Sequence, residues 1–260
     1  LTITARTRIK SEAEATDELW HEIRNAYRTR RILTGTLDGI EQTAGGKTLA
    51  TVSFRGFRIA IPIREMLVLD ERMPSGRAYA DYMNRLNRIL GTMLGAEIDF
   101  IVKGIDSTTH SAVASRREAM LRKRQTFYFG KDVSGNPYIY PGRLVEARVI
   151  AVAEKVLRVE AFGIECAIFA RDLSWQWVSD VRDLYSVGDR VLVRVQEISG
   201  EDAEHLSIRA DIRSTFSETS VDNLKKCQVQ SKYAGKVTDL RGGVVYIRLN
   251  NGVNAIAHTC

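Results

Sequence analysis

The segment "LYSVGDRVLVRVQEI" (184–198) contains the clearest strand pattern in the chain. A Val-Gly-Asp turn is followed by Val191, Val193 and Val195, which alternate with other side chains. Such period-two alternation is typical of a β-strand that buries one of its faces. The segment "TMLGAEIDFIVKGID" (92–106) has the same form, with a glycine turn that leads into an alternating strand. Two similar segments far apart in the chain predict a repeated β-domain.

The residues on either side of the earlier segment predict one complete unit. Short alternating strands over 34–67 are separated by glycine turns, as in a β-meander. A short helix is predicted over 75–90, and strands at 96–105 and 110–120 end the unit. The predicted order is therefore three strands, a helix and two strands.

A helix is predicted before this unit, over 11–31. Ser11 and Glu14 have the spacing of a capping box at its start. Its apolar residues recur on one face, as expected for a helix that packs on one side. These residues are Leu19, Trp20, Ile23, Ala26 and Tyr27.

The same order of elements is repeated downstream. Residues 145–175 predict three strands and 176–185 a short helical crossover. The strand in 184–198 follows, and 204–214 predicts a closing strand. Residues 225–260 predict only the first three strands of a third unit. The fold class is therefore mainly β, with tandem five-stranded barrels and connecting α-helices.

The order of these elements predicts the domain boundaries. A basic segment at 115–131 carries the aromatic residues Phe127, Tyr128 and Phe129, and is either a solvated linker or a phosphate-contacting surface. The predicted domains are an N-terminal linker helix (1–31), a first repeat with a helical insertion and a trailing basic helix (32–126), a linker (127–141), a second repeat (142–215) and an incomplete third repeat (216–260).

The composition excludes some classes of protein. A hydrophobic content of 44% is too high for a disordered chain, and a net charge of +6 favours an anionic partner. No run of 18 apolar residues predicts a membrane span. The chain begins at Leu1 without a visible signal peptide, so we expect a piece of a longer protein. Three scattered cysteines predict reduced thiols and a cytoplasmic location.

The sequence gives no support for catalysis, a metal site or a cofactor. The four histidines and three cysteines lie too far apart for a metal-ligand pattern. We find no paired-carboxylate signature, no glycine-rich phosphate loop with a lysine and no G-x-S-x-G motif. We therefore expect a protein that is not an enzyme.

The plan and several motifs resemble one known family. Five strands with a short helix between the third and fourth are the plan of an OB-fold. The segment "DLSWQWVSDVRDLYSVGDRVLVRVQEI" is similar to the second half of an S1 RNA-binding repeat, and "GKVTDLRGGVVYIRLNNGVNAIAHT" is similar to the first half of another. "ELWHEIRNAY", "GFRIAIP" and "AVASRREAM" resemble the second repeat of bacterial ribosomal S1 proteins. The three units then resemble repeats two, three and the start of four of those proteins, in order.

This resemblance implies an aromatic platform that binds single-stranded RNA. Familiar S1 repeats place Phe-Gly-x-Phe on the second and third strands and a His at the end of the third, while Lys and Arg contact the phosphates. In the third unit the resemblance places Tyr246 at the second Phe position and His258 at the His position, with Lys236, Arg241 and Arg248 nearby.

The resemblance is weaker in the other two units. In the second unit Phe169 takes the His position, and Lys155 and Arg158 take the two Phe positions. In the first unit Pro62 takes the His position and the strand "TLATV" has no aromatic residue, so its platform is lost. We expect Trp175 and Trp177 to pack at the mouth of the second barrel rather than to stack on bases.

Three functions remain open on this basis. The main hypothesis is a non-catalytic protein of the ribosomal S1 type that binds single-stranded RNA such as mRNA in translation, with possible contact to the ribosome through the first repeat. The first alternative is a ribosome-docking or protein-docking module with degenerate RNA platforms. The second is the accessory region of a ribonuclease.

Overall fold

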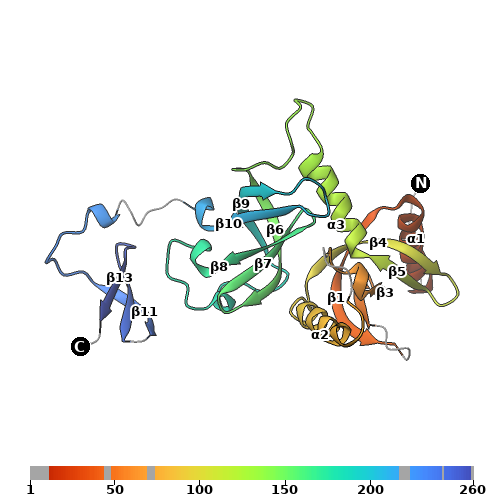
Figure 1. The fold of residues 1–260 in the computed structure, drawn as a ribbon, viewed down its shortest axis with the longest axis horizontal. Coiled ribbons are helices and arrows are strands. Elements are labelled where there is room, and N and C mark those ends of the chain that lie inside the picture. Colours follow the sequence, from red (N-terminus) through yellow and green to blue (C-terminus); the bar gives the residue numbers. More distant parts are fainter. Residues whose placement is uncertain (1–11, 44–47, 69–73, 217–222, 242, 259–260) are drawn as a thin grey trace, which may run out of the picture. The chain divides into compact units, whose positions relative to one another are not determined.

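A computed structural model of the chain describes residues 12–43, 48–68, 74–216, 223–241 and 243–258 (Figure 1). The chain packs as two compact units, Leu1–Val68 with Glu97–Ala119 and Leu69–Ala96 with Met120–Cys260. The predicted capping box of Ser11 and Glu14, the Gly45-Gly46 turn and Cys260 lie outside what the structure describes. Within the described residues, no helix is both long enough and apolar enough to span a membrane.

The first unit contains a closed five-stranded barrel in the order β1-β2-β3-β5-β4. All its neighbouring strands are antiparallel except β3 and β5, which pair in parallel. The strands are β1 (Ile32–Gln42), β2 (Thr48–Phe54), β3 (Phe57–Pro62), β4 (Glu97–Asp106) and β5 (Ser111–Ser115). A short 3₁₀ turn, Ile63–Glu65, follows β3.

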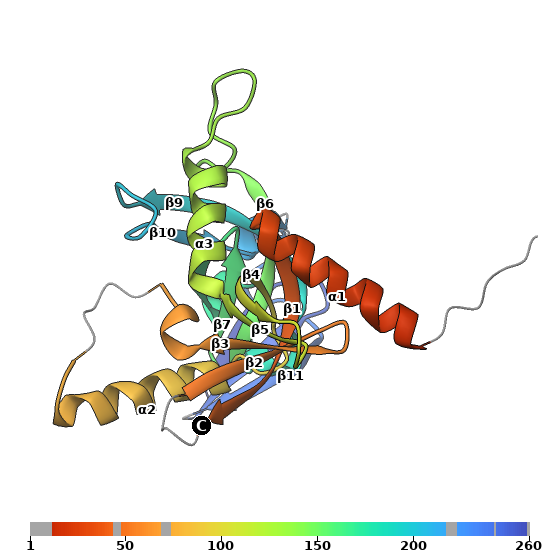
Figure 2. The ribbon, with the colours of Figure 1, turned by 90° about the vertical axis from the view of Figure 1, so that its right-hand side faces the viewer.

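Strand β4 contributes a continuous buried run to the core of this barrel. Ile98, Phe100, Ile101 and Val102 are completely buried and Asp99 is 2% exposed, so both faces of this strand are covered. Helix α1 (Glu12–Thr29) packs on β4 (Figure 2). Its Trp20 is 1% exposed and lies edge-on to the ring of His110. The apolar face predicted for this helix is therefore the face that it buries.

The second unit repeats the strand order of the first. Its five-stranded sheet runs β10-β9-β6-β7-β8 and is open between β8 and β10, where the first barrel is closed between β3 and β5. The strands are β6 (Leu144–Ala153), β7 (Val156–Ala161), β8 (Ile164–Phe169), β9 (Arg190–Ser199) and β10 (Ser207–Asp211). The predicted fold, mainly β with tandem OB-fold barrels and connecting helices, is confirmed.

The core of the second barrel includes residues from outside its strands. Val193 and Val195 of β9 are fully buried there, as predicted. Tyr128 and Ile139 join the same core from the stretch predicted as a linker, a contact that the sequence did not predict. The domain boundaries drawn from the sequence stay a prediction.

Helix α3 (Arg116–Arg124) and the π-helical turn that follows it, Gln125–Phe129, lead into the second barrel. The Arg124 side chain is buried, and its guanidinium donates to the carbonyl oxygens of Gly163 (2.6 Å) and Ala203 (2.9 Å). Gly163 has a φ of +87°, and a Cβ there would lie 2.4 Å from the Met120 carbonyl oxygen. Glycine is therefore required where this helix contacts the β7–β8 turn.

Helix α2 (Arg77–Gly91) agrees with the helix predicted over 75–90. Leu86 and Leu90 of its predicted apolar stripe are buried, whereas Tyr79 is 41% exposed. The helix belongs to the second compact unit, where Arg88 and Ile89 line a cavity of about 250 Å³ together with the β6–β7 hairpin.

The expected helical crossover at 176–185 is not a helix. Within 176–185 the structure has a single 3₁₀ turn, Val181–Asp183. Two other 3₁₀ turns lie outside this range, at Ala170–Asp172 and Arg213–Thr215. The Asp180 carboxylate accepts the backbone N–H of Arg182 and so caps the N-terminus of the Val181–Asp183 turn, which ends at Leu184 and does not extend into a helix.

The third repeat is a three-stranded antiparallel sheet within the described residues. Its strands are β11 (Gly235–Arg241), β12 (Val244–Leu249) and β13 (Asn254–His258), in that order. Cross-strand partners share a face, so the register gives the sheet two different faces. One face carries Val237, Val245, Ile247 and Ala257, and the other carries polar and aromatic residues.

Replacing Arg124 with alanine is expected to destabilise the second unit. The change removes a buried donor group from two backbone carbonyls, at a cost of about 2–4 kcal/mol in the free energy of unfolding. Urea unfolding followed by circular dichroism measures this cost. Arg122→Ala, which alters an exposed arginine two residues earlier in the same helix, is the control. Equal stability of the two variants would contradict the anchoring role.

Cys166 is expected to resist alkylation in the folded protein. Burial raises the pKa of its thiol to about 12, and the neighbouring Glu165 adds to this effect. At pH 8 its reaction with iodoacetamide should be slower than that of the half-buried Cys227 by more than about 100-fold. Mass spectrometry of labelled peptides measures both rates, and the two thiols should react alike in urea. Rapid labelling of Cys166 without urea would show that the barrel opens.

Candidate nucleic-acid interface

A groove of about 400 Å³ opens within the second unit where β8 ends. It is lined by side chains from the second barrel and by one from β12 of the third repeat. We call it the junction groove and define it by Lys155, Phe169, Arg171, Gln176, Trp177 and Tyr246. A second groove of about 300 Å³ shares several of these residues and adds Trp175, Arg213 and parts of β12 and β13.

Two aromatic rings join the second and third repeats at this groove. The indole of Trp177 and the phenol ring of Tyr246 are stacked, with 4.3 Å between ring centroids and 9° between their planes. Trp177 Nε1 also donates to the Asp239 carboxylate at 3.2 Å. Asn254 Nδ2 donates to the Trp175 carbonyl oxygen at 2.8 Å. The loop after β8 is therefore tied to the third repeat by one ring stack and two hydrogen bonds.

Three aromatic rings of the groove region have a cation beside them. Arg171 lies 5.6 Å from the Phe169 ring centroid, and Arg213 lies 4.8 Å from that of Trp175. Lys155 Nζ lies 5.8 Å from the Trp177 ring centroid. Rings that can stack on bases, together with cations that can contact phosphates, are the components of single-strand recognition.

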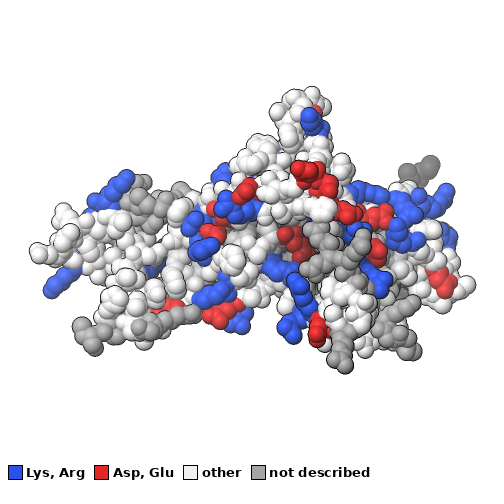
Figure 3. All heavy atoms as spheres, in the orientation of Figure 1, with Lys and Arg blue, Asp and Glu red and all other residues white. Residues whose placement is uncertain are grey.

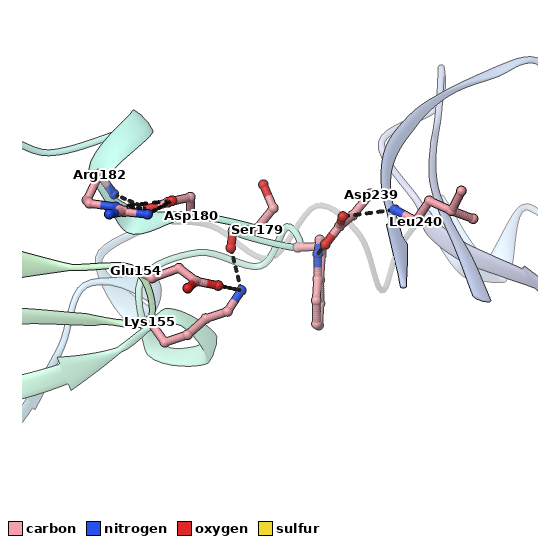
Figure 4. Close-up of polar contacts among 8 residues, drawn as sticks. Glu154, Lys155, Ser179, Asp180, Arg182, Asp239 and Leu240 are labelled. Carbon is pink, nitrogen blue, oxygen red and sulfur yellow. Dashed lines mark hydrogen bonds and ion pairs between the residues drawn. The ribbon is translucent and has the colours of Figure 1, made fainter. Parts of the chain in front are cut away.

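Hydrogen bonds fix the position of Lys155 at the edge of the groove (Figure 4). Its ammonium donates to the Ser179 carbonyl oxygen and lies 3.7 Å from the Glu154 carboxylate. Close by, hydrogen bonds from the Arg182 side chain lower the pKa of Asp180 to about 2, so this carboxylate stays charged at neutral pH. Figure 4 shows Asp239 approaching the same region from the third repeat.

The register of the third repeat places most of its predicted site residues on one face. Tyr246 and Arg248 are two residues apart on β12, and Arg248 pairs with Lys236 on β11. His258 pairs with Val244, which lies on that same face, and is exposed. The side chain of Arg241 lies outside what the structure describes. The RNA-binding role of these residues stays a prediction.

The second repeat separates its three predicted site residues. Phe169 is 49% exposed at the end of β8, so it is not a core residue, and it lines the junction groove with Lys155. Arg158 instead pairs with Glu165 and lines the cavity beside α2. The structure therefore brings Phe169 and Lys155 together and places Arg158 outside the groove.

Sequence reasoning missed Trp177, Arg171 and Gln176. We expected Trp177 to pack at the barrel mouth, but its side chain is 42% exposed and stacks on a residue from the next repeat. The available signal was the dense "WQW" motif directly after β8. Its contact with Tyr246 depends on tertiary structure that no local pattern reports.

Charge alone does not mark the interface. On the face shown in Figure 3, Lys and Arg are interspersed with Asp and Glu and do not form one large basic patch. No group of three or more His, Cys, Asp or Glu side chains that could hold a metal was found in the described part of the chain. The rings and their adjacent cations are therefore the feature that distinguishes the junction groove.

The second repeat matches a known family. Residues 139–209 match the model of the S1 RNA-binding domain. The chain carries an S1 RNA-binding domain. This match covers nearly all of the second barrel and confirms the resemblance to the S1 RNA-binding repeat, while the assignment to repeats two, three and four stays a prediction. Phe169, Arg171, Trp175 and Trp177 all lie within the matched residues of this S1 domain.

Two relatives align with nearly the whole chain. The small ribosomal subunit protein bS1 of Coxiella burnetii is 22% identical over 253 residues, which are 97% of this chain and 41% of that protein. A 4-hydroxy-3-methylbut-2-enyl diphosphate reductase of Clostridium acetobutylicum is 21% identical over 240 residues, 92% of this chain and 33% of that enzyme. The chain thus spans less than half the length of these curated relatives.

A solved structure is similar over a smaller part. It is an a/eIF2alpha–aDim2p–rRNA complex from Pyrococcus horikoshii OT3, with 20% sequence identity and a TM-score of 0.27. The similarity covers 34% of this chain and 53% of that chain.

Removing the Trp177 ring is expected to loosen the third repeat. Stacked aromatic pairs contribute about 0.5–1.5 kcal/mol beyond their buried area, so Trp177→Ala should speed amide exchange in β12 and β13 by roughly 2- to 12-fold. Hydrogen-exchange mass spectrometry measures this rate. Tyr140→Ala, at an exposed ring that lines neither groove, should leave it unchanged. Unchanged exchange in Trp177→Ala would mean that the stack adds no stability in solution.

Proposed function

We propose that the chain binds single-stranded RNA, without catalysis, through its second and third repeats. The observation that carries this proposal is the junction groove, where half-exposed rings of an S1 domain lie beside Lys155 and Arg171. Base stacking tolerates any sequence because every base has a π-face. The expected binding is therefore sensitive to salt, weakly dependent on sequence and selective for single strands.

The wider role proposed is that of a bacterial, cytoplasmic protein of the ribosomal S1 type acting on mRNA in translation. Its support is the low-identity alignment of 97% of the chain with a ribosomal bS1 protein. We assign the three units to repeats two, three and the start of four of such proteins. The reductase activity of the other relative is not carried over, because the chain spans only 33% of that enzyme.

We assign the first barrel a docking role, on the ribosome or another protein. Its aromatic residues are used for packing: Phe57 lies 5.5 Å from Trp20, and Phe54 lies 6.0 Å from Phe100, between ring centroids. The resemblance to S1 repeats places Pro62 at the position where they carry His. On this basis we assign no aromatic platform to the described residues of this barrel.

Fluorescence anisotropy with a labelled single-stranded RNA of about 20 nucleotides tests the proposal. Each phosphate contact lowers the slope of log K against log salt by about 0.7, so four contacting cations predict a slope of about −3. Phe169→Ala combined with Tyr246→Ala should weaken binding at least about tenfold, because a lost base stack on Phe169 costs roughly 1–3 kcal/mol and Trp177 loses the ring on which it is stacked.

Duplex RNA of the same length is the control ligand, and it should bind more weakly than the single strand. A protein that does not bind single strands would refute RNA binding. Binding that is unaffected by both substitutions would refute the aromatic contribution and favour a protein-docking module.

A further inference from the structure

We propose that the junction groove is a slot for one nucleobase, and that Trp177 forms one wall of it while Tyr246 holds Trp177 in position. This inference rests on the proposed binding of single-stranded RNA. It differs from a platform on the outer face of a single repeat, because both aromatic walls belong to the second repeat and the residue that holds Trp177 in position belongs to the third. Tyr246 is then a positioning residue and Trp177 the base-contacting one.

The geometry of the stack determines which ring face is open. At 4.3 Å between centroids and 9° between planes, Trp177 and Tyr246 cover each other and leave no space for a base between them. Trp177 nonetheless remains 42% exposed and lines the groove. The surface of Trp177 that Tyr246 does not cover is therefore the surface that a base in the groove would contact, next to Lys155 Nζ at 5.8 Å from the ring centroid.

The wall at the end of β8 is also aromatic. Phe169 is 49% exposed at the last position of that strand, and Arg171 lies 5.6 Å from its ring centroid. A groove of about 400 Å³ falls within the usual range of about 300–1,000 Å³ for small-molecule sites. This space accommodates a base and its sugar next to both rings.

Polar and charged side chains at the rim of the groove can contact the phosphates and the base edge of a nucleotide. Lys155 and Arg171 supply positive charge for the phosphate on either side of the base. The amide of Gln176 lines the groove and carries both a donor and an acceptor, as hydrogen bonding to a base edge requires. A groove with aromatic walls, a polar side chain and cations at its rim matches the chemistry of a single extruded nucleotide.

The fixed position of Trp177 gives this site its stiffness. Its indole N–H donates to Asp239 at 3.2 Å, and its ring lies against Tyr246, so two contacts restrict its side-chain rotation. A ring held in place before binding loses less conformational entropy when a base stacks on it. Loss of Tyr246 should therefore weaken RNA binding through Trp177, and Tyr246→Phe should restore it.

The test uses the 260-residue chain and a single-stranded RNA of about 12 nucleotides that carries one 2-aminopurine, whose fluorescence falls on stacking. We expect quenching with the unaltered protein. Trp177→Ala and Phe169→Ala should each reduce the quenching and weaken binding by about 5- to 150-fold. Trp177→Phe, which keeps a ring, should retain most of both signals. Tyr140→Ala, which removes an exposed ring paired with Arg143 outside the groove, is the matched control and should change neither.

Three results would overturn the slot. Tighter binding by Trp177→Ala would show that Trp177 is a lid over Tyr246. Unchanged binding by Trp177→Ala and Phe169→Ala, with weaker binding by Lys236→Ala and Arg248→Ala, would place the RNA on the outer face of the third repeat and leave the proposed function intact. No RNA binding by the unaltered protein would refute both proposals together. If Trp177→Ala fails to fold, Phe169→Ala decides the question, because it alters an exposed strand end.

Discussion

Every strand of a small β-barrel must give one of its two faces to the core, and the rest of this structure follows from that constraint. In the second barrel the buried faces are filled by residues such as Val159, Val193 and Val195, all without exposed surface. Residues that contact a ligand are therefore restricted to the outer faces of strands, to strand ends and to connecting loops. Phe169 is at such an end, where β8 has left the core.

The second barrel is open where the first is closed, and this difference bears on where its site can form. In the first barrel, β3 pairs with β5 and is covered on that side. In the second, β8 pairs with β7 alone among the described strands, and the chain that follows it carries Arg171, Trp175 and Trp177. Because the same strand order is kept, the two barrels differ in side chains and closure rather than in topology. Scaffold and binding functions can therefore reside on equivalent folds.

Local pattern predicted the strands and helices well because alternation and turn residues act over a few positions. Val193 and Val195 were assigned to one buried face from spacing alone, and both are fully buried. The helix predicted over 176–185 was wrong, because only the Val181–Asp183 turn forms there and the preceding Trp177 contacts Tyr246 and Asp239 of the third repeat. The resemblance led to Tyr246 and Phe169, but the stack on Trp177 joins residues from different repeats. Such contacts depend on how the chain packs, which periodicity does not encode.

The mixed surface charge has a consequence for how RNA affinity would arise. A net charge of +6 spread among many acidic groups gives little long-range attraction, since charges are screened over about 8 Å at physiological salt. Only cations directly beside the bound strand, such as Lys155 and Arg171, then contribute much to phosphate binding. The stacking of bases on Phe169 and Trp177 depends less on ionic strength than the binding of phosphates by cations does. The affinity that remains at high salt is therefore a direct measure of what the rings contribute.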